Sequence, residues 1–179
     1  MKHYLVAMIE DNYSPSIAYL QKNLSRRYKL YKNTPVLHIP LGVINSNDTE
    51  KLIEILSKIF APYKKFKIST NNEIVFNESS NTVGLKVTNE GYINKIHRNI
   101  FDTLALYNIP IKEFNNSTLN IPLANSNHSI RKLISNNGFY INQSKSLDDY
   151  YSFVRVTKFE LWKHTNNKDI IKSFILKDY

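Results

Sequence analysis

Two stretches of this sequence read LHIPL (residues 37–41) and LNIPL (residues 119–123). The copies differ only in one residue, which is His38 in the first and Asn120 in the second. Each copy lies in a short apolar segment bounded by polar residues, which is typical of a buried strand. The repeat therefore predicts two similar strands, one in each half of the chain.

Alternation of side chains across a strand gives each copy an apolar face and a second face. The leucines and the isoleucine share the apolar face, which we expect to pack on helices. The second face holds His38 and Pro40 in the first copy, and Asn120 and Pro122 in the second. This face is either the polar edge of a core strand or, if the two halves come together, one side of a common groove.

The composition excludes several classes of function. The chain has 179 residues, of which 42% are hydrophobic, and this suits one domain or two small lobes. It contains no cysteine, so disulfides, thiolate zinc sites and cysteine nucleophiles are excluded. Only four glycines are present, and no glycine-rich phosphate loop can be found. No His/Asp/Glu cluster has metal-ligand spacing, so we expect neither a metal nor a cofactor.

The formal net charge of +9 favours an anionic partner. The alternative is an AT-rich coding sequence, which enriches lysine, asparagine, isoleucine and tyrosine. The first residues lack the length and cleavage site of a signal peptide, and no stretch is long and apolar enough to span a membrane. We therefore expect a cytoplasmic protein without a membrane partner, or one in the host cytoplasm if it is viral.

The order of predicted strands and helices along the chain indicates an α+β fold rather than a parallel sheet, because several strands follow one another without a crossover helix. We expect residues 1–179 to form a single domain of two pseudo-symmetric lobes, each with one xIPL strand (36–44 and 117–125). Helices are predicted at 16–29, at 91–107 and, with Asn47 and Glu50 as a capping box, at 47–60. Further strands are predicted at 3–9, in KFKIST, EIVFN and TVGLKVT, and in a closing hairpin of 151–164 with 170–176. A short helix is predicted at 129–135 and a loop at 136–149.

Four segments of the chain resemble the two-histidine phosphoesterases, in the branch of bacterial RNA-ligase-like and cyclic phosphodiesterase proteins. They are HYLVAMIEDN, LSRRYKLYKNTPVLHIPL, LNIPLANSN and FELWK. The resemblance implies a bilobal fold, with antiparallel sheets around a central cleft and helices outside. It also implies two strands of pattern His-x-Thr/Ser, whose histidines act as general base and general acid on a phosphodiester. The hydroxyls of that pattern hold the phosphate oxygens.

This chain departs from the family pattern at three of the four positions. His38 stands at the first histidine and Asn120 at the second, while Pro40 and Pro122 stand at the hydroxyls. Proline has no side-chain donor, and asparagine does not exchange a proton near neutral pH. The resemblance therefore implies a drier site that binds a small nucleotide-derived ligand, such as a cyclic nucleotide or an ADP-ribose derivative, without cleaving it. By analogy, such a protein would serve a phage as a sponge for host nucleotide signals.

Four other residues are candidate ligand contacts. Tyr4 and Lys86 each alternate with apolar neighbours on a predicted strand, so their side chains would face the cleft. Arg131 lies near the start of a short predicted helix, a position that favours phosphate. Trp162, the only tryptophan, could stack on a base. Each of these residues also has a purely structural interpretation, such as an exposed strand lysine or a packed tryptophan.

Two alternative functions remain open at this point. The first is an active 2′,3′-cyclic or 2′-5′ phosphodiesterase, or an RNA-end-processing enzyme, that uses His38. The second is an RNA-binding or protein-binding module that uses the basic surface. Neither the ligand nor the oligomeric state follows from the sequence.

Overall fold

The structure is a computed structural model of the whole chain. It describes residues 1–10, 15–27, 35–77, 81–88, 90–113, 119–127, 152–163 and 169–179. Three helices and eight strands lie within these ranges. They are β1 (Lys2–Ile9), α1 (Pro15–Arg27), β2 (His38–Asn45), α2 (Thr49–Phe60), β3 (Phe66–Asn77), β4 (Thr82–Val87), α3 (Gly91–Leu106), β5 (Ile111–Lys112), β6 (Asn120–Asn125), β7 (Ser152–Trp162) and β8 (Ile170–Ile175).

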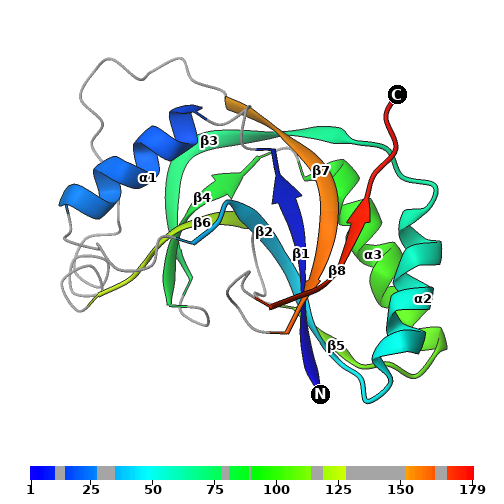
Figure 1. Cartoon of the computed structure of the whole chain (residues 1–179). Coiled ribbons are helices and arrows are strands. Elements are labelled where there is room, and N and C mark those ends of the chain that lie inside the picture. Colours follow the sequence, from blue (N-terminus) through cyan, green and yellow to red (C-terminus); the bar gives the residue numbers. More distant parts are fainter. Residues whose placement is uncertain are drawn as a thin grey trace.

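The strands form one antiparallel sheet in the order β5-β2-β1-β7-β3-β4-β6, with β8 paired to β7. Two long strands, β7 and β3, connect the parts of the sheet on either side of its bend. β7 pairs with β1 through its second half and with β3 through its first, and β3 then pairs with β4 through its own second half. Figure 1 shows the result, a strongly curled sheet with helices on its outside. The predicted α+β class with antiparallel pairing is confirmed.

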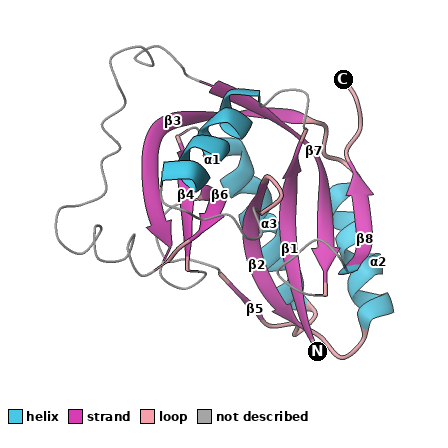
Figure 2. Cartoon of the chain, turned by 60° about the vertical axis from the view of Figure 1, so that its left-hand side comes forward, coloured by secondary structure: helices cyan, strands magenta, loops and turns pink. Residues whose placement is uncertain are grey.

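Helices cover the outer face of this sheet. Figure 2 shows α2 beside β8, and α1 next to the part of the sheet that holds β4 and β6. The apolar stripes of α2 and α3 and the apolar faces of the strands meet in one main core. The face of the sheet that points away from this core is called the inner face below. The division of the domain into two pseudo-symmetric lobes stays a prediction.

Local signals explain two of the helix ends. The side chain of Asp48 accepts a hydrogen bond from the Lys51 backbone N–H at 2.9 Å and so caps α2. The predicted capping box at Asn47 is therefore wrong by one residue, since the Asn47 side chain instead accepts from the Met1 amino group. Asn108 follows α3 with a φ of 55°, as expected of a residue that ends a helix.

The sequence predicts two strands where the structure has one. The asparagine pair at residues 71–72 indicates a turn, but β3 continues through it because its two ends pair with different partners. The register of β3 against β4 shifts between Thr70 and Ile74. The ladder is therefore irregular at the place where the sequence predicts a turn. The helix predicted at 129–135 and the loop predicted at 136–149 lie outside the described residues. No helix in the described ranges is long and apolar enough to cross a membrane.

Gln21 of α1 connects the two strands that carry the repeat. Its side-chain amide donates to the backbone oxygens of Pro35 and Leu123, both at 2.9 Å. Pro35 leads into β2, and Leu123 lies in β6, whose outer edge has no strand partner among the described residues. One side chain therefore satisfies two carbonyls and holds the start of β2 beside β6.

We expect Gln21→Leu to lower the free energy of unfolding by about 1–3 kcal/mol, because two carbonyls lose their donor while the side-chain volume is kept. Chemical denaturation monitored by circular dichroism measures the change. Lys22→Ala, at an exposed position on the same helix, is the control and should change stability little. Equal denaturation midpoints for Gln21→Leu and the control would contradict this role.

Candidate ligand-binding site

The inner face of the sheet begins with β1. Leu5, Ala7 and Ile9 belong to the main core, so the alternating residues Tyr4, Val6 and Met8 point the other way. Val6 and Met8 pack with Trp162 of β7 in a second, smaller apolar cluster, with Tyr4 against it. Tyr4, a predicted site residue, is therefore on the inner face, directly opposite Trp162 in the β1–β7 register.

His38 lies on this face, opposite Met8 in the β1–β2 register. Its Nδ1 lies 2.6 Å from the Val36 carbonyl oxygen. Because a carbonyl can only accept, Nδ1 carries the hydrogen and Nε2 of the neutral ring keeps a lone pair. The ring is 8% exposed and packs against Trp162, with ring centroids 4.9 Å apart and planes tilted by 59°. The imidazole is thus fixed as a hydrogen-bond acceptor.

Burial lowers the pKa of His38 below its ordinary value of 6.5. The hydrogen bond to Val36 and the negative charge of Glu160 oppose this shift but are weaker than the desolvation. Desolvation also lowers the pKa of His3, which is buried and whose Nε2 lies 3.2 Å from the Thr49 hydroxyl. His38 is therefore neutral at neutral pH and brings no positive charge to the inner face.

Trp162 belongs to a polar network on β7. Its indole N–H donates to Glu160 Oε2 at 2.8 Å, while Glu160 Oε1 lies 2.6 Å from Lys158 Nζ and accepts from the Ser173 hydroxyl at 3.3 Å. Trp162 and Glu160 are each 1% exposed. The indole ring contacts His38 in this arrangement, and its predicted role of stacking on a base stays a prediction.

Sequence reasoning missed Lys158, Glu160 and Ser173. A signal was present, because a glutamate between Phe159 and Leu161 must face away from the apolar core if the strand alternates. What the sequence did not show is that Glu160 would be buried on that side. In the described part of the chain, β7 pairs with β1 and β8, which place Val6 and Ser173 directly beside Glu160.

The second copy of the repeat places Asn120 and Pro122 away from the main core, because Ile121 and Leu123 lie in it. Asn120 is opposite Lys86 of β4, and Pro122 is opposite Gly84. A Cβ built on Gly84 would lie 2.6 Å from Asn120 Oδ1, so the absence of a side chain at Gly84 makes room for Asn120. Lys86 forms an ion pair with Glu73 at 2.9 Å.

Both prolines lie at the same kind of irregularity. Pro40 pairs with Val6 just where the β1–β2 register shifts, and Pro122 pairs with Gly84 just where the β4–β6 register shifts. Proline is tolerated at bulges because it cannot donate to the ladder. The local geometry of the sheet thus supplies one reason for proline in both copies.

The structure brings most predicted site residues into two groups. Tyr4, His38, Pro40 and Trp162 lie on the inner face of β1, β2 and β7, whereas Asn120, Pro122 and Lys86 lie on β6 and β4. The two groups approach each other, since β2 and β6 lie side by side without a ladder between them (Figure 1). Arg131 lies outside the described residues. Within the described ranges, no group of three His, Asp or Glu side chains could hold a metal ion.

A cavity of about 620 Å³ lies elsewhere, on the outward side of α3. Its lining includes Tyr63, Asn94, Lys95, Arg98 and Asp102. The buried stripe of α3 faces the main core, so this cavity is on the opposite side of the sheet from His38.

No family model matches the sequence, and no curated protein matches it. Several solved structures are similar to the folded chain. E. coli LigT complexed with 3′-AMP superposes with a TM-score of 0.62 at 10% identity, covering 98% of this chain and 97% of LigT. Kluyveromyces marxianus Usb1 with uridine monophosphate gives 0.58 at 13% identity, covering 98% of both chains. TT0787 of Thermus thermophilus gives 0.57 at 12% identity, covering 99% of both chains.

The chain therefore has a LigT-like fold. The similarity extends over nearly the whole of each chain. At this level of sequence identity the likeness concerns the fold, and the chemistry has to be argued from the residues of this chain.

We expect Gly84→Ala to lower the free energy of unfolding by about 1–3 kcal/mol, because its methyl group would displace the Asn120 amide. The loss should be smaller when Gly84→Ala is made in an Asn120→Ala background, where the closest obstacle is gone. A double-mutant cycle by chemical denaturation measures this coupling. Additive losses would show that Asn120 does not occupy the space over Gly84.

Stability should fall as the pH drops below about 6.5. His3 and His38 have lowered pKa values in the folded state, so the unfolded chain takes up protons first and is favoured at acidic pH. Their contribution is complete above the unfolded value and is lost as the pH approaches the folded values. Denaturation between pH 7.5 and 5.5 measures the slope, which His38→Gln should reduce. An unchanged slope in that variant would contradict the buried neutral imidazole.

Proposed function

We propose that this protein binds and sequesters a small, nucleotide-derived, phosphate-bearing ligand on the inner face of its sheet without cleaving it. Cyclic nucleotides and ADP-ribose derivatives are the ligands we favour. The observation that carries the proposal is the set of groups on the two repeated strands, which is one histidine, one asparagine and two prolines. This set combines hydrogen-bonding groups with a single proton-exchanging side chain.

The fold supports the choice of ligand. LigT has been solved with 3′-AMP and Usb1 with uridine monophosphate, and both structures superpose on nearly the whole chain. The presence of nucleotides in those structures makes a nucleotide the first kind of ligand to test on this chain. The net charge of +9 also favours an anionic ligand.

The residues argue against turnover. Hydrolysis of a phosphodiester by acid–base catalysis needs one group to accept a proton and another to donate one. Asn120 cannot exchange a proton, and Pro40 and Pro122 offer no donor to a phosphate oxygen. Loss of one acid–base partner alone costs on the order of 10²–10⁴-fold in rate.

The hydrogen-bonding character of the face suits the sugar or base of a nucleotide. Neutral His38 presents a lone pair at Nε2, which can accept a hydrogen bond from a ribose hydroxyl or an exocyclic amine. The amide of Asn120 can donate and accept. A cytoplasmic protein with these properties would lower the free concentration of a nucleotide signal, and a phage that evades host defence is one setting for that role.

One observation favours a second candidate, RNA binding. Lys95 and Arg98 line the cavity on α3, and neither forms an ion pair or hydrogen bond with another described residue. Tyr92, exposed on the same helix, lies near Tyr63. Cations beside aromatic rings suit a single-stranded phosphate backbone and its bases. The two candidates use opposite sides of the sheet and can be tested separately.

The direct test is to incubate the protein with cyclic dinucleotides, ADP-ribose derivatives and 2′,3′-cyclic nucleotides, remove free ligand, denature the protein and identify what is released. We expect one of them to be recovered intact. His38→Ala and Asn120→Ala should each weaken its binding about tenfold, which corresponds to roughly 1.4 kcal/mol.

Two outcomes contradict sequestration. Cleavage of a panel member that His38→Ala abolishes would identify a phosphodiesterase. No binding of any nucleotide, together with salt-sensitive binding of single-stranded RNA that Lys95→Ala with Arg98→Ala removes, would identify the α3 surface as the functional one.

A further inference from the structure

His38 and Lys158 lie in one row across the inner face. Met8 of β1 is directly opposite His38 on β2 and directly opposite Lys158 on β7. Since paired strands are about 4.8 Å apart, the backbones at His38 and Lys158 are roughly 10 Å apart. A group bound over Met8 is therefore within reach of both side chains.

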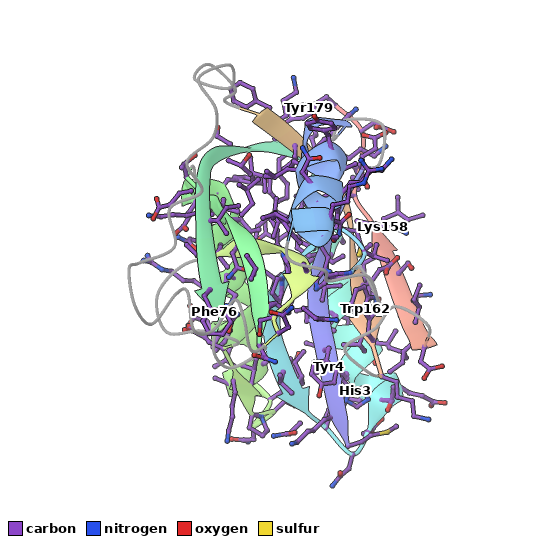
Figure 3. All side chains as sticks on the ribbon, turned by 90° about the vertical axis from the view of Figure 1, so that its left-hand side faces the viewer. His3, Tyr4, Phe76, Lys158, Trp162 and Tyr179 are labelled. Carbon is purple, nitrogen blue, oxygen red and sulfur yellow. The ribbon has the colours of Figure 1, made fainter. Side chains whose placement is uncertain are left out.

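The ion pair between Lys158 and Glu160 is asymmetric. The lysine side chain is 39% exposed, whereas that of the glutamate is 1% exposed. The positive end of the pair thus lies at the surface of the inner face and the negative end beneath it. Figure 3 shows Lys158, Trp162 and Tyr4 one after another along this side of the molecule.

Glu160 also holds the lysine in place. Its carboxylate is bound by the Trp162 indole, the Ser173 hydroxyl and Lys158, and a buried carboxylate that lost its cation would be strongly destabilised. Lys158 therefore remains at Glu160 when a ligand arrives. An ammonium has three N–H donors, so those not directed at Glu160 are available to an anion.

Lys86, the cationic contact predicted from the sequence, lacks this arrangement. Lys86 is 31% exposed and its partner Glu73 is 44% exposed, so both ends of that pair face solvent. Exposed ion pairs of this kind fix geometry weakly. The sequence pattern favours Lys86 as the cationic contact, and the structure offers Lys158 as a better-ordered one.

We propose that Lys158, positioned by Glu160, binds the anionic phosphate group of the ligand beside His38. The inference rests on the proposed function, because it assigns a part of that ligand to a place on the same face. In this arrangement the charge of the phosphate meets a fixed ammonium, while neutral His38 remains free to accept from a hydroxyl or amine.

Trp162 makes the test direct, since it is the only tryptophan of the chain and is bonded to Glu160 while packing on His38. Tryptophan fluorescence is followed during titration with inorganic pyrophosphate, and then with any nucleotide that the panel identifies. We expect a saturable change in the wild type. Lys158→Met with Glu160→Gln removes both charges at once, so no buried charge is left alone, and it should weaken the response at least tenfold.

The matched control is Lys58→Met with Glu54→Gln, which removes an exposed ion pair on α2, away from the inner face, and should leave the midpoint within twofold of the wild type. Circular dichroism confirms that both double variants are folded. An unchanged midpoint in Lys158→Met with Glu160→Gln overturns the inference, and so does the absence of any pyrophosphate response in the wild type.

The two proposals fail in different ways. If a nucleotide binds the wild type and the Lys158→Met/Glu160→Gln variant equally, the proposed sequestration is supported and the proposed role of Lys158 is contradicted. If pyrophosphate binding depends on Lys158 but no nucleotide binds more tightly than pyrophosphate, the phosphate site at Lys158 is supported. The proposal that the ligand is a nucleotide is then contradicted.

Discussion

The alternation of side chains around His38 in β2, Asn120 in β6 and Glu160 in β7 is the constraint on which both the core and the inner face depend. Each strand sends Leu, Ile or Phe side chains toward the helices, and the same geometry sends every second residue to the other side. His38, Asn120 and Glu160 are where they are because their neighbours are in the core. A one-residue slip in any of these strands would exchange the two faces.

The electrostatics of the inner face follow from burial. His38 is kept neutral because desolvation, which lowers its pKa, outweighs the nearby charge of Glu160. Lys86 and Lys158 on this face are each paired with a carboxylate, so neither ion pair adds a net charge at its place. Recognition of an anion at Lys158 therefore depends on how the N–H donors of the ammonium are placed rather than on an excess of positive charge there.

The sequence was sufficient to predict which residues of the repeat share a face, because a period of two requires no tertiary information. The sequence was also sufficient to predict the α+β class, the closing hairpin of β7 and β8, and the end of α3 near Asn108. It failed where a residue's environment depends on a distant partner. β3 runs through an asparagine pair and pairs with β7 at one end and β4 at the other, and Glu160 is buried beside Val6 of β1 and Ser173 of β8.

The repeated proline has a structural explanation that the sequence alone did not offer. β2 and β6 lie side by side, yet no ladder joins them among the described residues. A free strand edge tends to pair with any neighbouring edge, and a proline blocks such pairing because it lacks an N–H. Pro40 and Pro122 stand in these two strands, each at a register shift, and Gln21 bridges the strands through a side chain instead. The same constraint acting on both strands accounts for the same residue in both copies. Because proline has no backbone N–H, neither Pro40 nor Pro122 can contribute a donor to a ladder between β2 and β6.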